Sequence, residues 1–171
     1  MIKKAVEQAL NEQIKREEFS SRLYLAMASW CEVNGFPGAA SFLYAQAEEE
    51  RMHMMKLVNY VNDRGGHALF FGLEQPEHNY ESLSAIFKMV MKHEQYITAS
   101  INDLYDVCMT EKDYTTGNFL QWYINEQIEE ESSMSTILDQ INLIGKDNTG
   151  FFLIDRELGQ RKPTAIVGGG E

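Results

Sequence analysis

Residues 42–61 read FLYAQAEEERMHMMKLVNYV, and the apolar side chains of this stretch recur at intervals of three or four. That interval matches the α-helix, with about 3.6 residues per turn, and it predicts one apolar stripe formed by Phe42, Ala45, Leu57 and Val61. Glu50 and His53 fall in the same stripe. Because residues three apart project from the same side of a helix, the stretch predicts a core-facing helix with a polar pair in its buried face.

Turn-forming residues, mostly glycine, proline and asparagine, divide the remaining sequence into segments with the same helical periodicity. The breaks fall at residues 34–38, 65–79, 111–113 and 145–150. Around them, the apolar pattern predicts four long helices and a shorter fifth one, near residues 3–33, 38–64, 81–110, 113–143 and 151–158. Since no stretch shows a useful strand period, the expected fold class is all-α.

The lengths of the connections predict how these helices are arranged. A helix of thirty residues is about 45 Å long, so four of them side by side make a long four-helix bundle. The first and third connections are short and predict antiparallel hairpins, whereas residues 66–80 are long enough to cross the bundle from end to end. We therefore expect one long crossover between the second and third helices, a domain over residues 1–160, and a flexible C-terminal tail over 161–171.

The charge of the chain limits its partners. The sequence has 26 acidic and 15 basic residues and a net charge of −11, which argues against nucleic acid and against an anionic membrane surface. It contains no run of about 18 apolar residues, so we expect no membrane span. Cys31 and Cys108 are too few for a disulfide scaffold and are typical of reduced core thiols in the cytoplasm. An acidic protein of this kind attracts cations.

Each of the other long helices also carries a glutamate in its predicted apolar stripe. Glu17 lies in the stripe of the first helix, whose other members are Val6, Leu10, Ile14, Ser21, Leu25 and Ala28. Glu94 and Glu130 occupy the stripes of the third and fourth helices near their middles. Buried carboxylates cost several kcal/mol unless they are neutralised, and no lysine or arginine shares these positions. Oxygen-rich ligation with one imidazole favours iron or manganese over a thiolate-binding metal.

The spacing of these residues follows a pattern seen in di-metal proteins. In such bundles, two helices contribute one glutamate each and two contribute Glu-x-x-His. Here Glu17 and Glu94 are the single glutamates, and Glu50-x-x-His53 is an intact pair. The fourth helix offers Gln127-x-x-Glu130, which lacks the imidazole.

The sequence resembles the bacterial non-haem ferritins over about residues 1–160. The matching features are Glu17 with Tyr24, EERMH at 49–53, KHE at 92–94, and NFLQWY at 118–123 followed by Glu126-Gln127-x-Glu129-Glu130. The resemblance implies a ferroxidase centre with Glu17, Glu50 and His53 at one iron. It also implies that Glu50 bridges to a second iron near Glu94 and Gln127, and that Tyr24 hydrogen-bonds within the centre.

The same resemblance implies what happens to the iron. Fe²⁺ would be oxidised by dioxygen or hydrogen peroxide and stored as a ferric mineral in a hollow homo-oligomeric shell of 24 subunits. A third iron would bind on the cavity side, near Glu49, Glu126, Glu129 and Glu130. Haem is not expected, because Arg51 stands where bacterioferritins have a haem-binding methionine.

Two other interpretations remain open from the sequence. The bundle is also compatible with a different di-metal carboxylate oxidoreductase, such as an oxygenase or a manganese catalase, although these usually have a second Glu-x-x-His. A metal-free helical interaction protein is the other alternative. At the third position, Glu49 and Glu129 can equally belong to a solvated acidic face.

Overall fold

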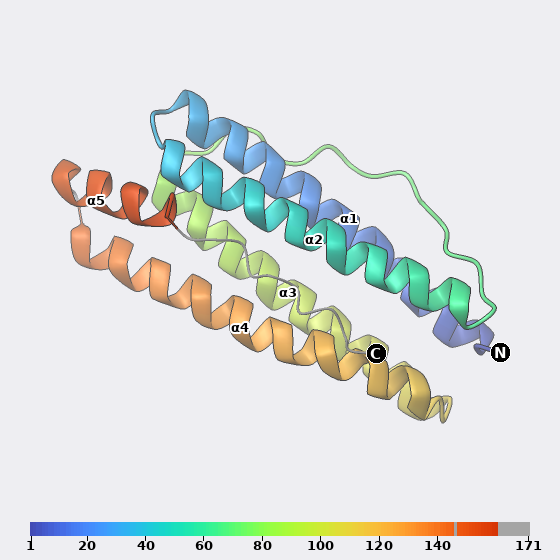
Figure 1. Cartoon of the computed structure of the whole chain (residues 1–171). Coiled ribbons are helices and arrows are strands. Elements are labelled where there is room, and N and C mark those ends of the chain that lie inside the picture. Colours follow the sequence, from blue (N-terminus) through green and yellow to red (C-terminus); the bar gives the residue numbers. More distant parts are fainter. Residues whose placement is uncertain (146, 161–171) are drawn as a thin grey trace.

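The computed structural model describes residues 1–145 and 147–160, and every regular element among them is a helix (Figure 1). The elements are α1 (Lys4–Val33), α2 (Pro37–Asp63), α3 (Leu83–Thr110), α4 (Tyr114–Ile144) and α5 (Asn148–Leu158). The all-α prediction is confirmed, and the bounds of the four long helices agree within two residues. The tail predicted for 161–171 lies outside the described residues.

The predicted start of the fifth helix is wrong by three residues. The apolar pattern begins at Phe151, but α5 begins at Asn148 because Asp147 caps it. The Asp147 carboxylate accepts hydrogen bonds from the backbone N–H groups of Thr149 and Gly150. Such a cap satisfies donors of the first turn that have no partner inside the helix, so the helix extends beyond its apolar part.

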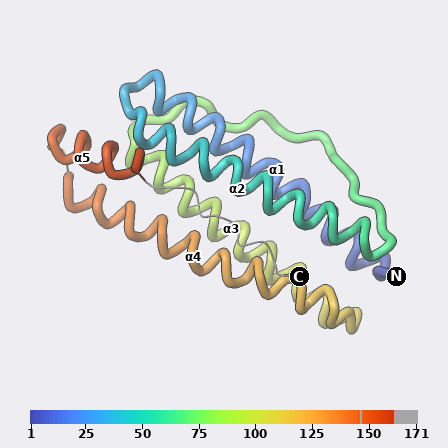
Figure 2. Tube along the Cα trace, in the orientation of Figure 1, coloured from blue at the N-terminus to red at the C-terminus, as the bar shows by residue number. Residues whose placement is uncertain are grey.

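The four long helices form two antiparallel hairpins, α1–α2 and α3–α4, joined by an extended crossover (Figure 2). The crossover between α2 and α3 runs the length of the bundle, as predicted. Its first part is held against α1 by Asn11, whose side chain donates to the carbonyl of His67 at 3.1 Å and accepts from the N–H of Leu69 at 2.7 Å. The second and third helices are therefore parallel.

The hydrophobic core consists of two clusters, one toward each end of the bundle. One cluster contains Tyr24, Leu43, Phe87 and Ile137, and the other contains Leu10, Leu57, Ile101 and Leu120. Between them, all four long helices turn buried polar side chains inward, namely Glu17, Gln46, Glu49, Glu50, His53, Glu94, Gln127 and Glu130. A polar layer thus interrupts the apolar interior near mid-bundle.

Helix α5 packs across the end of the bundle at the start of α2. Ile154 and Leu158 are buried there, whereas Phe152 is 67% exposed, so only part of the predicted apolar face of this helix is covered within one subunit. The Asp155 carboxylate accepts hydrogen bonds from the N–H groups of Gly38 at 3.1 Å and Ala39 at 2.8 Å. Phe36, the residue before α2, provides no side-chain cap, and these two bonds from α5 cap the start of α2 instead.

Gly38→Ala is expected to weaken the docking of α5. A Cβ at position 38 would lie 1.7 Å from the main-chain oxygen of Asp155, so one helix must move. Overpacking of this kind costs about 1–3 kcal/mol, which lowers the melting temperature of a chain of this size by about 2–12 °C. Thermal unfolding followed by circular dichroism measures the change. Gly72→Ala is the control, because nothing lies within 4 Å of a Cβ there; equal melting temperatures for the two variants would contradict the prediction.

Candidate metal centre

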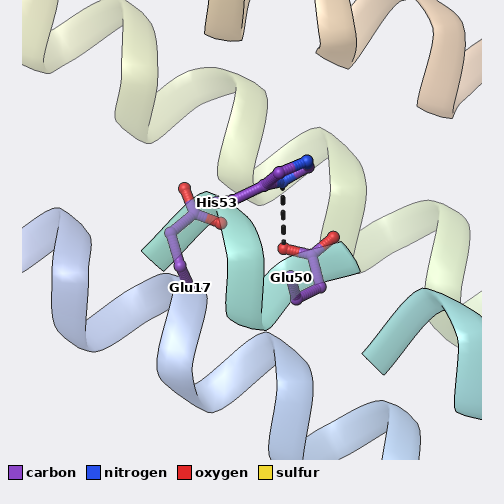
Figure 3. A group of neighbouring side chains, drawn as sticks. All are labelled: Glu17, Glu50 and His53. Atoms are coloured by element: carbon purple, nitrogen blue, oxygen red, sulfur yellow. Dashed lines mark ion pairs between the residues drawn. The ribbon is translucent and has the colours of Figure 1, made fainter. Parts of the chain in front are cut away.

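Glu17, Glu50 and His53 come together in the polar layer (Figure 3). Glu17 extends from α1 toward the other two, which stand one turn apart on α2. The potential ligand atoms of the three residues lie within 4.8 Å of one another, and Glu50 Oε2 is 3.6 Å from His53 Nδ1. Each residue is at most 2% exposed. The arrangement is therefore a buried group of two carboxylates and one imidazole, as the sequence predicted.

Each member of this group has an atom without a hydrogen-bond partner. Within the described part of the chain, these buried unpaired atoms include Glu17 Oε2, Glu50 Oε1 and His53 Nε2. Buried polar atoms in folded proteins are nearly always paired, and an unpaired one costs about 1–3 kcal/mol. Three such atoms in one small group fit the donor set of a divalent cation that binds oxygen and imidazole.

Glu94, Gln127 and Glu130 form the adjoining part of the layer, from α3 and α4. Glu94 accepts hydrogen bonds from the Tyr24 hydroxyl and from Gln127 Nε2, the latter at 3.0 Å. Glu130 accepts from Gln46 Nε2 at 3.0 Å. Tyr24 thus contacts Glu94, one of the residues predicted for the centre. Gln46 was not assigned a role from the sequence, since an uncharged side chain in a stripe gives no sign of its partner.

Burial shifts the ionisation of this layer. Desolvation, followed by the charge of Glu50, raises the pKa of Glu17 well above its usual value, and desolvation followed by Glu94 does the same for Glu50. Desolvation and the neighbouring charges of Glu94 and Glu49 raise the pKa of Glu130 to about 8. In the absence of a cation, the layer therefore retains protons near neutral pH, and a bound cation must displace them.

The metal-free protein is expected to lose stability as the pH rises from about 6.5 to about 8. A carboxyl whose pKa is higher in the folded than in the unfolded protein stabilises the folded state most at low pH, below the unfolded pKa of 4.5. This contribution is lost as the pH rises to the folded pKa, which is about 8 for Glu130. The loss is up to about 1.4 kcal/mol per pH unit for each such group. His93 does not obscure this loss of stability. Burial lowers the pKa of His93 to about 4, so the gain in stability that this histidine causes with rising pH is complete near pH 6.5.

Denaturant unfolding of chelator-treated protein at several pH values measures this dependence. The matched variant is Glu130→Gln, which keeps the shape of the side chain and removes its titration, so its slope between pH 6.5 and 8 should be shallower. A free energy of unfolding that increases with pH across this interval in the wild-type protein would refute the expected proton retention.

A second group lies beside the first and shares His53. Potential ligand atoms of Glu49, His53 and Glu126 also lie within 4.8 Å of one another. Glu49 is buried and Glu126 is half-buried, and desolvation is the largest cause of the raised pKa of each. Of the four residues predicted for a third iron, the structure thus brings two together. Glu129 is exposed and Glu130 is turned to Gln46, and neither belongs to this group among the described residues.

The described helices include none that is long and apolar enough to cross a membrane.

Comparison with known proteins places the chain in a family. Residues 7–144 match the Ferritin-like domain family. The chain is 46% identical over 159 residues to a probable bacterial non-heme ferritin-like protein of Haemophilus influenzae, covering 93% of this chain and 96% of that one. It is 46% identical over 156 residues to the bacterial non-heme ferritin of Campylobacter jejuni, covering 91% and 93%.

Solved structures agree with the sequence comparison. An engineered closed form of the Archaeoglobus fulgidus ferritin superposes with a TM-score of 0.94 at 40% identity, over 96% of this chain and all of the other. The open-pore ferritin of the same archaeon gives a TM-score of 0.93, also at 40% identity, over 95% of this chain. With the family match and the buried glutamate–histidine layer, these similarities show that the chain belongs to the ferritin family and is of the bacterial non-haem type.

Proposed function

We propose that this protein oxidises Fe²⁺ and stores the product as a ferric mineral, that is, that it is an iron-storage ferroxidase. The observation that carries the proposal is the buried group of Glu17, Glu50 and His53, in which each residue has an unpaired polar atom. Oxidation of a metal ion inside a helical bundle needs a buried site whose ligands neutralise the charge of the ion. The family relationship supports iron as the substrate.

In this proposal, the polar layer binds two Fe²⁺ ions. Glu17, Glu50 and His53 hold the first ion, Glu50 bridges, and Glu94 and Gln127 hold the second with Glu130 beside it. Four carboxylates match the charge of two Fe²⁺ ions, so binding releases the protons that burial had retained. Two Fe²⁺ ions supply two electrons, which dioxygen or hydrogen peroxide accepts. The more highly charged Fe³⁺ is then no longer matched by the ligands and leaves.

Tyr24 and Gln127 have positioning roles in this scheme. Both donate hydrogen bonds to Glu94, one to each carboxylate oxygen. Burial and the charge of Glu94 raise the pKa of Tyr24 well above its usual value, so its hydroxyl stays a donor at neutral pH. The neutral amide of Gln127 adds no charge to the second position, which favours exchange of iron over permanent binding.

The group of Glu49 and Glu126, with Glu129 and Glu130 nearby, is proposed as a third iron site that passes iron onward. Sites made mainly of carboxylates bind hard cations and allow exchange. Glu49→Gln with Glu129→Gln should therefore keep the fast oxidation of the first two irons per subunit and alter the slower phases or the iron stoichiometry. Stopped-flow absorbance over successive additions of Fe²⁺ measures both. If the double variant matches the wild type in every phase, these residues form only a solvated acidic face.

We further propose that the subunits, each folded over residues 1–160, assemble into a hollow shell of 24 copies in the cytoplasm. Phe152 and Leu153 of α5 are 67% and 58% exposed, and Leu143 at the end of α4 is 88% exposed. Neighbouring apolar side chains of this kind are typical of surfaces that contact another subunit. A closed shell would also provide the interior in which a mineral collects.

The test of the proposed function is an anaerobic titration with Fe²⁺ followed by air, with absorbance and particle mass recorded. We expect saturation near two irons per subunit before air, rapid oxidation afterwards, and a large particle that gains mass with further iron. A stable monomer that takes up no iron would indicate a metal-free interaction protein. Oxidation without any gain in particle mass would instead favour another di-metal oxidoreductase.

A further inference from the structure

Gln13 is a fully buried amide of α1, one turn before Glu17. It lies at the boundary between the polar layer and the apolar cluster that contains Leu10 and Ile14. Its Nε2 donates a hydrogen bond to Glu17 Oε1 at 2.8 Å. Burying an amide is unfavourable unless its polar atoms are hydrogen-bonded. Both the nitrogen and the oxygen of the Gln13 amide therefore need partners.

The orientation of this amide is determined by its other contacts. Gln13 Oε1 lies 2.9 Å from the hydroxyl of Ser100 on α3 and accepts from Arg16 Nη1 at 3.3 Å. An arginine side chain can only donate hydrogen bonds, so the atom facing Arg16 must be the oxygen. The amide nitrogen must then face Glu17. The geometry thus excludes the flipped amide, which would place its N–H groups opposite the arginine, so that two donors face each other.

Gln13 makes the two oxygens of Glu17 unequal. Oε1 accepts from the amide, whereas Oε2 is buried and has no partner among the described residues. The same amide joins α1 to α3 through Ser100, six residues along α3 from Glu94. Glu17 and Glu94 stand on the two helices that this contact connects.

We propose that Gln13 is a positioning residue for the first metal, holding Glu17 Oε1 so that Oε2 is the atom presented to the cation. The Arg16 guanidinium, which can only donate, keeps the amide in this orientation, and the contact with the Ser100 hydroxyl links the α1 ligand to α3. This inference rests on the proposed function, because it takes Glu17 to be a ligand. Without Gln13, both oxygens of Glu17 are free to bind, and the geometry of the first site changes.

Gln13→Met tests this role, because methionine fills a similar volume and cannot donate to Glu17. The probe is Co²⁺ under anaerobic conditions, whose visible absorption reports coordination geometry without any turnover. We expect the affinity of the first site for Co²⁺ to fall by about 10–100-fold, the range found when an outer partner of a metal ligand is removed. We also expect the spectrum of the bound ion to change.

Two serine variants complete the test. Ser100→Ala removes one partner of the Gln13 oxygen while keeping the amide, so it should shift the spectrum in the same direction with a smaller loss of affinity. Ser21→Ala is the matched control, because Ser21 is also buried beside the layer but donates its hydrogen bond to the carbonyl of Ala47, at 2.7 Å, and not to a proposed ligand. Its affinity and spectrum should equal those of the wild type.

The outcomes separate this inference from the proposed function. If the wild type binds Co²⁺ and both Gln13→Met and Ser100→Ala give the same affinity and spectrum, Gln13 has no positioning role and the inference is overturned while the metal site stands. If the wild type binds no Co²⁺ in the bundle, the metal site itself fails and the inference fails with it.

Discussion

Replacement of both Glu50 and His53 by alanine is expected to lower the rate of Fe²⁺ oxidation by at least about 100-fold while the helices remain folded. The two residues supply the proposed bridging carboxylate and the imidazole of the buried group. Their loss should exceed the effect of losing an outer partner, which costs roughly 10–100-fold. The fold should persist, because removing a buried carboxylate also removes repulsion from Glu17 and Glu94.

Stopped-flow absorbance after mixing Fe²⁺-loaded protein with oxygenated buffer measures the rate. The matched control is Glu48→Ala with Met52→Ala, which changes two exposed side chains on the same turns of α2. Circular dichroism and particle mass establish that both double variants are folded. Oxidation at the wild-type rate in the Glu50/His53 variant would show that the chemistry occurs elsewhere.

The second large effect concerns metal binding without turnover. Zn²⁺ at about 100 times its dissociation constant should stabilise the protein by about 2.7 kcal/mol, because it binds the folded form and pairs the unpaired atoms of Glu17, Glu50 and His53. For a chain of this length, that gain raises the melting temperature by about 5–11 °C.

Scanning calorimetry of chelator-treated protein, with and without Zn²⁺, measures the gain. Mg²⁺ should give a smaller increase, because it prefers octahedral oxygen ligation and retains its waters. The Glu50→Ala/His53→Ala variant should show no Zn²⁺-dependent increase. An equal increase in this variant and in the wild type would place the zinc outside the polar layer.

Much of the fold follows from the sequence, because helical periodicity and turn residues act locally. The four long helices were predicted within two residues, and the length of the 66–80 link was enough to predict the crossover. The path of the crossover was not predictable, since it depends on the contacts that Asn11 makes with residues distant in the sequence. Leu25 was predicted in the stripe of α1 but is 43% exposed. The buried face is centred on Tyr24, Met27 and Ala28, and spacing alone does not define the centre of a stripe.

The candidate centre was predictable where a charge interrupts an apolar stripe. Glu17, Glu50, His53, Glu94 and Glu130 stood out for this reason, and the structure buries all five; their individual roles as ligands remain predictions. Gln13, Gln46 and Ser100 gave no such sign, because uncharged polar residues are common in helices and their partners lie on other helices. The spacing of one turn between Gln13 and Glu17 was the only available indication. The exposure of Glu129 likewise depends on how α4 is rotated in the bundle.

Anomalous diffraction at the iron absorption edge tests the central claim most directly, on crystals soaked anaerobically in Fe²⁺. The claim is that the polar layer between the four helices is a two-metal site. We expect two peaks about 3.5–4 Å apart, one beside Glu17 and His53, the other beside Glu94 and Gln127, with Glu50 between them. Iron bound only at exposed acidic side chains, with no peak inside the bundle, would contradict the claim.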